Sequence, residues 1–134
     1  MCVTVPGGIR IFTSVLQAVV NIIDHGMSPQ QAVEAPRLWT QGAEVQLEHT
    51  FDPSGGTSGG SGLREQLEAK GHVLSPPVAT VGGGMSCVMF SDKHEEEKEG
   101  EAAVMMTGAC CWRADGTPIG VSGGFAKPGA RFRL

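Results

Sequence analysis

Two helices joined by a tight glycine turn occupy most of residues 9–35, and they constrain the fold more than any other feature. The apolar residues between Phe12 and Ile23 follow the spacing of one helical face, and three further isoleucines widen that stripe. The stripe consists of Phe12, Val15, Leu16, Val19, Val20 and Ile23, widened by Ile9, Ile11 and Ile22. Gly26 predicts the end of this helix, since glycine readily takes the left-handed conformation that closes helices. We therefore expect a long helix that buries more than one side.

A second, short helix is predicted to begin directly after the turn. Ser28 is a candidate N-cap, Pro29 suits the first helical position, and Gln31 stands where a capping box needs it. This helix can extend only to about Ala35, because Pro36 disfavours helical backbone in the residue before it. The sequence thus predicts a long buried helix, a tight turn and a second, capped helix of one or two turns.

The chain before the first helix carries a glycine pair, Gly7-Gly8, after a short predicted strand over residues 1–5. Amide groups at the start of a helix attract anions, and glycines let two of them point outward with no Cβ in the way. Such a pair can stabilise an oxygen that becomes negatively charged during a reaction. A Pro-Gly-Gly sequence is more often a plain turn, and both interpretations stay open at this point.

Several stretches of the chain resemble the gamma-glutamyltranspeptidase family, in the C-terminal part of its small subunit. The glycine pair and the Ala-Pro-Arg block at 35–37 are the specific ones. The resembling stretches are residues 6–11, 15–17, 26–28, 32–37, 45–48, 67–73 and 120–122. Their order and approximate spacing match the family across most of the chain.

This resemblance implies an α+β fold, namely part of the αββα sandwich of the N-terminal-nucleophile hydrolases, as a single incomplete domain over residues 1–134. It implies transfer of a gamma-glutamyl group from glutathione-like amides to water or to an amino-acid or peptide acceptor. In the family an N-terminal threonine attacks the carbonyl and its own amine is the base, so no cofactor and no metal are needed. By position, Gly7 and Gly8 match the oxyanion-hole glycines.

The threonine nucleophile is expected upstream of this chain, because in the family it precedes the glycine pair. The expected partners are therefore a gamma-glutamyl substrate, the remaining small-subunit segment and the large subunit of the same precursor. We expect the chain alone to be inactive, since Thr4 is internal and has no free amine. The alternative is an inactive truncated homologue that acts, if at all, as an interaction module. Arg10 and Arg37 are expected to be structural, bonding carbonyls or a carboxylate near the helix boundaries.

The composition of the chain bears on which other classes of function are possible. The net charge of −4 originates at residues 92–101, where six acids and two lysines form a predicted acidic loop. The rest is balanced, and no cluster of basic residues indicates nucleic-acid binding. No apolar run approaches a membrane span. The four cysteines fit no zinc spacing and predict separate thiols, with adjacent Cys110 and Cys111 on opposite faces of a strand.

The remaining segments give strands, turns and loops. Alternation over residues 44–49 predicts a half-buried strand whose solvent face carries Glu44 and Glu48, a better interpretation than an acid–base pair. The Asp-Gly turn at 115–116 predicts a hairpin that pairs residues 102–113 with 117–121. Three further segments are predicted to be a flexible Gly/Ser loop at 53–62, a short helix at 63–70 and a loose tail at 122–134.

Overall fold

The computed structural model describes residues 1–51, 62–91, 105–119, 121–122 and 125–126. Most of the predicted Gly/Ser loop, the whole acidic loop and most of the tail lie outside these residues. The described α-helices all lie before residue 70, and strands both precede and follow them. In order they are β1 (Cys2–Thr4), α1 (Ile11–Ile23), α2 (Pro29–Glu34), β2 (Leu38–Thr40), β3 (Val45–Leu47), α3 (Leu63–Ala69), β4 (Ser86–Ser91), β5 (Met105–Cys110), β6 (Val121–Ser122) and β7 (Phe125–Ala126).

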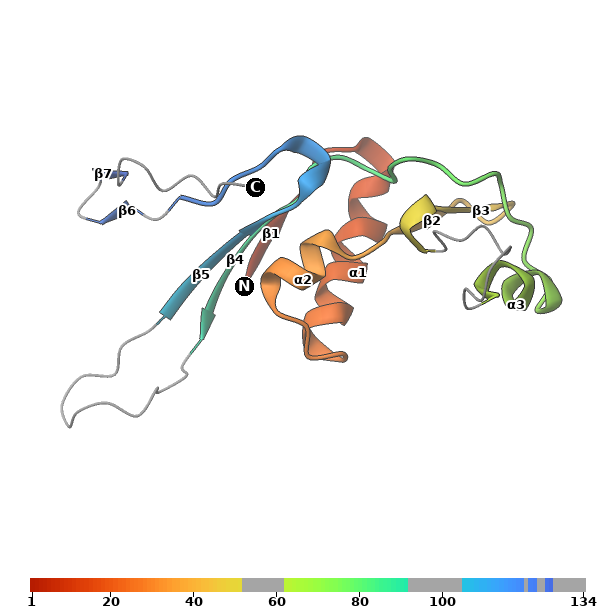
Figure 1. Ribbon diagram of the computed structural model, residues 1–134, viewed down its shortest axis with the longest axis horizontal. Helices are drawn as coiled ribbons and strands as arrows, with labels where there is room; N and C mark the ends of the chain where they lie inside the picture. Colours follow the sequence, from red (N-terminus) through yellow and green to blue (C-terminus); the bar gives the residue numbers. More distant parts are fainter. Residues whose placement is uncertain (52–61, 92–104, 120, 123–124, 127–134) are drawn as a thin grey trace.

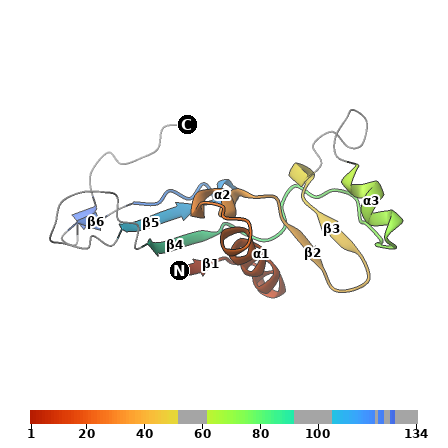
Figure 2. The same ribbon diagram turned by 90° about the horizontal axis from the view of Figure 1, so that it is seen from below.

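One antiparallel sheet, in the order β1-β4-β5, forms the body of the structure. The hairpin β2–β3 and helix α3 extend from the opposite end of an elongated molecule (Figure 1). Ala18 of α1 and Val33 of α2 join Cys87 and Ala109 of the sheet in one core cluster. Figure 2 shows α2 next to the end of β5 and α1 beside α2. The core thus occupies one face of the sheet.

The predicted long helix is present, but its buried face differs from the expected one. A 3₁₀ helix, Gly8–Arg10, leads directly into α1, and Gly26 has a φ of 64° beyond its end. Ser14 and Ala18 are the fully buried residues of α1, whereas Phe12 and Leu16 are exposed by 81% and 62%. Small side chains let the helix approach its neighbours closely on the Ser14 side. Phe12, Leu16 and Ile23 therefore face outward, whereas Val15 and Ile22 are partly buried and pack against the core.

The short second helix follows the prediction closely. The Ser28 hydroxyl accepts a hydrogen bond from the Gln31 amide at 3.2 Å, and the Gln31 side chain accepts one from the Ser28 amide at 2.9 Å. This is a complete capping box, with Pro29 at the first helical position. It fixes α2, which buries Val33 against the sheet.

The predicted hairpin across the Asp-Gly turn is wrong. Strand β5 pairs with β4 along its whole length, from Met105 opposite Ser91 to Cys110 opposite Ser86. After β5 the chain forms a 3₁₀ helix, Trp112–Ala114, and Asp115 takes a left-handed φ of 47°. The turn signal is therefore real, but no strand is assigned to the described residues 117–119.

Candidate oxyanion site

The glycine pair lies at the exposed start of the first helix. Gly7 has a φ of 146° and Gly8 a φ of 58°, both in the region that glycine alone occupies easily. The Gly7 carbonyl accepts a hydrogen bond from the Arg10 amide at 3.1 Å, which closes the first helical turn. Neither the Gly7 nor the Gly8 amide donates a recorded hydrogen bond within the described residues. Both amides are therefore free of ladder bonds.

A second glycine segment, Gly82–Gly84, holds the glycine pair in place. The Gly83 amide donates to the Pro6 carbonyl at 3.0 Å. A Cβ on Gly83 would lie 2.6 Å from Pro6 Cγ, so only glycine fits this close approach. The backbone just before Gly7 thus rests directly on this second loop.

The Arg37 side chain holds the Gly82–Gly84 loop in place. It is 2% exposed, and its guanidinium donates to the carbonyls of Gly83 and Val33, each at 2.9 Å. The expected structural role of Arg37 is confirmed. Arg10 differs from the expectation, because it bonds the Gln46 side-chain oxygen at 3.0 Å and lies over the Trp39 ring. It still serves packing between α1 and the β2–β3 hairpin.

The solvent-facing position predicted for Glu48 is wrong. Glu48 is 1% exposed, and its carboxylate accepts bonds from the amides of Val81 at 2.7 Å and Arg37 at 2.9 Å. The Arg113 guanidinium completes the set, donating from both Nε and Nη2 in a bidentate ion pair. Strand β3 ends at Leu47, so the alternation no longer decides which way Glu48 points. Glu44, by contrast, is exposed as predicted.

The two buried arginines have different electrostatic surroundings. Burial lowers the pKa of Arg37, and the neighbouring Arg113 charge lowers it further. Burial also acts to lower the pKa of Arg113, but the hydrogen bonds and charge of Glu48 outweigh it and raise that pKa. Both side chains remain cations at neutral pH. We call these two arginines, Glu48 and Cys111 the buried charge cluster.

Cys111 is the fourth member of this cluster. It is 1% exposed, and its sulfur accepts a hydrogen bond from the Met85 amide at 3.0 Å. Cys110 is only partly buried, so the two adjacent cysteines face opposite ways as predicted. No sequence pattern marked Cys111 or Arg113 as a site residue. Arg113 lies 65 positions after Glu48, a separation that no local pattern links.

Other features of the described chain lie apart from the glycine pair. A cavity of about 390 Å³ is lined by residues of α2, Cys110, Trp112 and the 115–118 segment. The described residues contain no group of three acidic, histidine or cysteine side chains placed to hold a metal ion. No helix in the described part of the chain is long and apolar enough to cross a membrane.

Comparison with known proteins identifies the family. The sequence model of the gamma-glutamyltranspeptidase family matches residues 1–116. The acylase ACY 1 proenzyme of Pseudomonas sp. (strain V22) is 47% identical over 131 residues, which are 96% of this chain and 20% of that protein. The glutathione hydrolase proenzyme of Escherichia coli (strain K12) is 43% identical over 72 residues, 52% of this chain and 11% of the other.

Solved structures agree with this match. A mutant of Helicobacter pylori gamma-glutamyltranspeptidase superposes with a TM-score of 0.65 at 26% identity, over 83% of this chain and 52% of that one. The chain therefore spans about a fifth of the first of these relatives and about half of the solved chain. Its mixed helices and strands are part of the N-terminal-nucleophile hydrolase fold. The chain belongs to the gamma-glutamyltranspeptidase family.

Proposed function

We propose that this chain is a section of a gamma-glutamyltransferase or glutathione hydrolase and supplies its oxyanion-hole amides. The observation that carries the proposal is the glycine pair itself. Gly7 and Gly8 present two exposed amides, unpaired among the described residues, at the start of a helical segment. The segment continues without a break into α1, whose dipole adds positive potential at this end.

The proposed reaction is acyl transfer through a covalent ester. A threonine hydroxyl, supplied from outside this chain, attacks the carbonyl carbon of a gamma-glutamyl amide such as that of glutathione. Its proton passes to the threonine amine, which then protonates the departing amine of the substrate. Water or the amine of an amino acid or peptide then attacks the ester and releases the gamma-glutamyl product.

The glycine amides act when the carbonyl becomes tetrahedral. The oxygen gains negative charge at that moment, and amides already fixed in position stabilise it without reorganisation. One such donor contributes about 3 kcal/mol to the barrier in comparable sites. The Gly82–Gly84 loop and Arg37 would keep the backbone at Pro6 in place during this step. No organic cofactor or metal takes part in this scheme.

The remaining small-subunit segment and the large subunit of one precursor are the proposed partners. Two similar proteins are named as proenzymes, which fits a precursor that is processed. The partner segments would bring the threonine to the glycine pair. The chain alone is expected to release no product from a gamma-glutamyl anilide.

A chimera tests the proposed role of the glycine pair. The chain replaces the matching section of the E. coli glutathione hydrolase proenzyme, and release of the anilide product is measured. Gly8→Ala is compared with Gly26→Ala, since the two glycines have φ values of 58° and 64° and neither has an atom within 4 Å of an added Cβ. Both variants carry the same backbone strain, but only Gly8→Ala disturbs the proposed donors. We expect kcat to fall about 10²-fold for Gly8→Ala alone.

Two results would contradict the proposal. Equal activity of the two variants would remove the glycine pair from catalysis. Turnover by the isolated chain, purified free of any relative, would show that the nucleophile lies within it. A Gly26→Ala chimera that is itself inactive would be repeated with Gly42→Ala, another open glycine with positive φ.

A second candidate is hydrolysis of a different acyl amide. The relative that matches 96% of this chain is named an acylase, whereas the glutathione hydrolase matches 52%. The same amides would serve, because the oxyanion is common to both reactions. A chimera would separate the two reactions. The chain would replace the matching section of the acylase proenzyme, and the chimera would be assayed against a gamma-glutamyl amide and a non-amino-acid acyl amide.

The non-catalytic alternative is an interaction module. It predicts binding to a full-length relative without turnover.

A further inference from the structure

The buried charge cluster contains more positive than negative formal charge if Cys111 is a neutral thiol. Arg37, Glu48 and Cys111 are each exposed by 2% or less, and the Arg113 side chain by 1%. The cluster then contains two guanidinium groups and a single carboxylate, which the Arg113 guanidinium bonds. Within the described residues, no other acidic side chain bonds either arginine. An unbalanced buried charge is strongly unfavourable, so a second anion is expected in this cluster.

The Cys111 sulfur has the kind of neighbours that a negatively charged atom requires. The Met85 amide donates to it at 3.0 Å. The guanidinium groups of Arg37 and Arg113 lie near enough to the sulfur for their positive charges to act on it. A neutral thiol is a weak acceptor, whereas a thiolate is a strong one. Every one of these neighbours offers a proton, and two of them carry positive charge.

Cys87 provides a comparison within the same core. It is 2% exposed, almost as buried as Cys111. Burial raises the pKa of the Cys87 thiol, as expected in apolar surroundings. Burial acts in the same direction on Cys111, but the amides of Met85 and Arg113 and the charge of Arg37 outweigh it and lower that pKa. The two cysteines differ in their donors and not in their exposure.

We propose that Cys111 is a thiolate in the folded protein and supplies the second negative charge of the buried charge cluster. It acts as a positioning residue, because it holds Arg37 and Arg113 at the point where three chain segments meet. Arg37 in turn bonds the Gly83 carbonyl, and the Gly83 amide bonds Pro6, directly before Gly7. The link to the glycine pair rests on the proposed function, whereas the ionisation of Cys111 does not.

The proposal fixes the sign of a pH dependence. The Cys111 pKa is lower in the folded chain than in the unfolded one, so ionisation favours folding. This contribution is complete above the unfolded pKa and is lost as the pH falls from there through the folded pKa. The charged groups that face the sulfur are Arg37 after α2, Arg113 in the last 3₁₀ helix and, through them, Glu48 after β3.

Ultraviolet absorbance of the thiolate tests the ionisation directly in the 134-residue chain. In the variant Cys2→Ser, Cys87→Ser, Cys110→Ser, only Cys111 remains, and we expect its thiol to be ionised at neutral pH, with a pKa below that of a free cysteine. The matched control keeps only Cys87, whose pKa should lie above that of a free cysteine. Folded wild-type chain at neutral pH should likewise lose one equivalent of thiolate absorbance when urea unfolds it. A Cys111-only chain whose thiol is protonated at neutral pH while folded, or wild-type chain without that loss, overturns the proposal.

Two substitutions separate charge from packing at the same position. Cys111→Asp keeps a negative charge and Cys111→Ser removes it. We expect the serine variant to have at least a tenfold smaller folded-to-unfolded ratio than the aspartate variant at neutral pH, because only aspartate replaces the charge. A serine variant as stable as the aspartate variant would contradict the charge role.

Amide resonances of Gly7 and Gly8 test the second link. They should shift in Cys111→Ser and stay close to the wild type in Cys111→Asp. Unchanged resonances beside a confirmed thiolate would leave the charge role standing and refute the positioning of the glycine pair. Failure of the chimera assay alone would refute the proposed function and not the thiolate.

Discussion

Glu48 shows how a single side chain connects distant parts of this chain. Its carboxylate accepts bonds from the amides of Arg37 and Val81 and from the Arg113 guanidinium. Sequence alternation placed Glu48 beside Glu44 on a solvated face, because nothing local distinguishes the two glutamates. The three partners come from segments that only the fold brings together. A buried carboxylate of this kind is therefore invisible to sequence reasoning, whereas the glycine pair and the Ser28 cap are local signals that could be predicted.

At this scale we expect Glu48→Gln to destabilise the chain by about 3–5 kcal/mol. The amide keeps the shape but leaves two guanidinium groups facing no carboxylate. Urea unfolding, followed by circular dichroism, measures the change. Glu44→Gln is the matched control, since Glu44 is exposed and should change stability by less than about 0.5 kcal/mol. Equal effects of the two substitutions would show that the ion pair contributes nothing.

The elements follow their local signals where packing agrees with them. The capping box predicted α2, and its two hydrogen bonds are present. The Asp-Gly turn was also real, yet the predicted hairpin failed because the pairing partner of β5 is β4. A turn residue fixes the backbone over a few positions, but strand pairing depends on which surfaces can be buried together. Local sequence signals therefore predicted where helices and strands end better than they predicted which strands pair.

The cap of α2 gives one prediction for this scale. Ser28→Ala removes the acceptor for the Gln31 amide and should cost about 1 kcal/mol. Ser28→Asp retains an acceptor and should stay near the wild type. Thermal or urea unfolding compares the two variants. A loss in Ser28→Asp as large as in Ser28→Ala would mean that the hydroxyl serves another purpose.

The contact between the Gly82–Gly84 loop and the 3₁₀ helix Trp112–Ala114 gives a second prediction at the scale of elements. A Cβ on Gly84 would lie 2.2 Å from Ala114 Cβ, so Gly84→Ala should cost about 1–3 kcal/mol. Ala114→Gly removes the opposing methyl group and should restore much of that loss in the double variant. The interaction energy from a double-mutant cycle measures the contact. Additive effects would contradict a direct clash.

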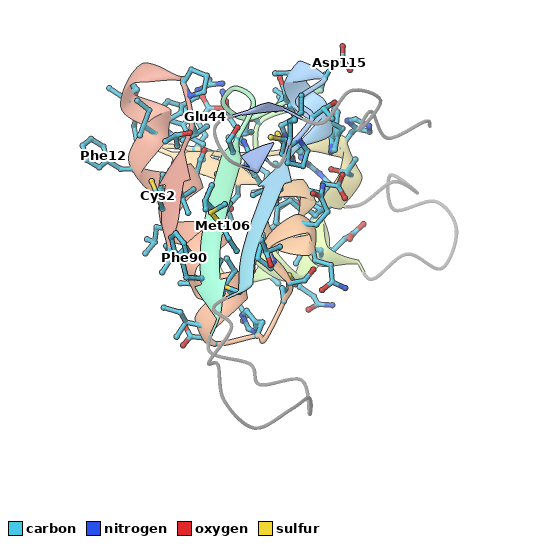
Figure 3. The ribbon with its side chains drawn as sticks, turned by 90° about the vertical axis from the view of Figure 1, so that its left-hand side faces the viewer. Cys2, Phe12, Glu44, Phe90, Met106 and Asp115 are labelled. Carbon is cyan, nitrogen blue, oxygen red and sulfur yellow. The ribbon has the colours of Figure 1, made fainter. Side chains whose placement is uncertain are left out.

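At the scale of the whole molecule, the described residues include two groups of apolar side chains that face outward. The first is on the helical segment and comprises Ile9, Phe12, Leu16 and Ile23, each exposed by more than 60%. The second is the sheet face opposite the helices, where Val88, Phe90 and Met106 are exposed. Figure 3 shows Phe90 and Met106 over the strands and Phe12 projecting from α1. The apolar pattern predicted an apolar helix correctly, but the side that packs within this chain is the one with small residues.

These surfaces predict binding of a hydrophobic fluorescent dye by the folded chain. Phe12→Asp and Leu16→Asp together should reduce the dye signal while changing stability by less than about 0.5 kcal/mol each. Val33→Ala serves as a contrast, because Val33 is fully buried and its loss should destabilise without removing exposed apolar area. A folded wild-type chain that binds no dye would contradict this prediction.

The long separation between Glu48 and Arg113 also bears on synthesis. Arg113 follows Glu48 by 65 residues, so a growing polypeptide exposes the carboxylate well before its ion-pair partner leaves the ribosome. Until then the nascent chain has Arg37 close by but cannot close the cluster. The register of β5 and of the 3₁₀ helix after it must therefore be set after Arg113 has been synthesised, and errors introduced there would undo contacts made by much earlier residues.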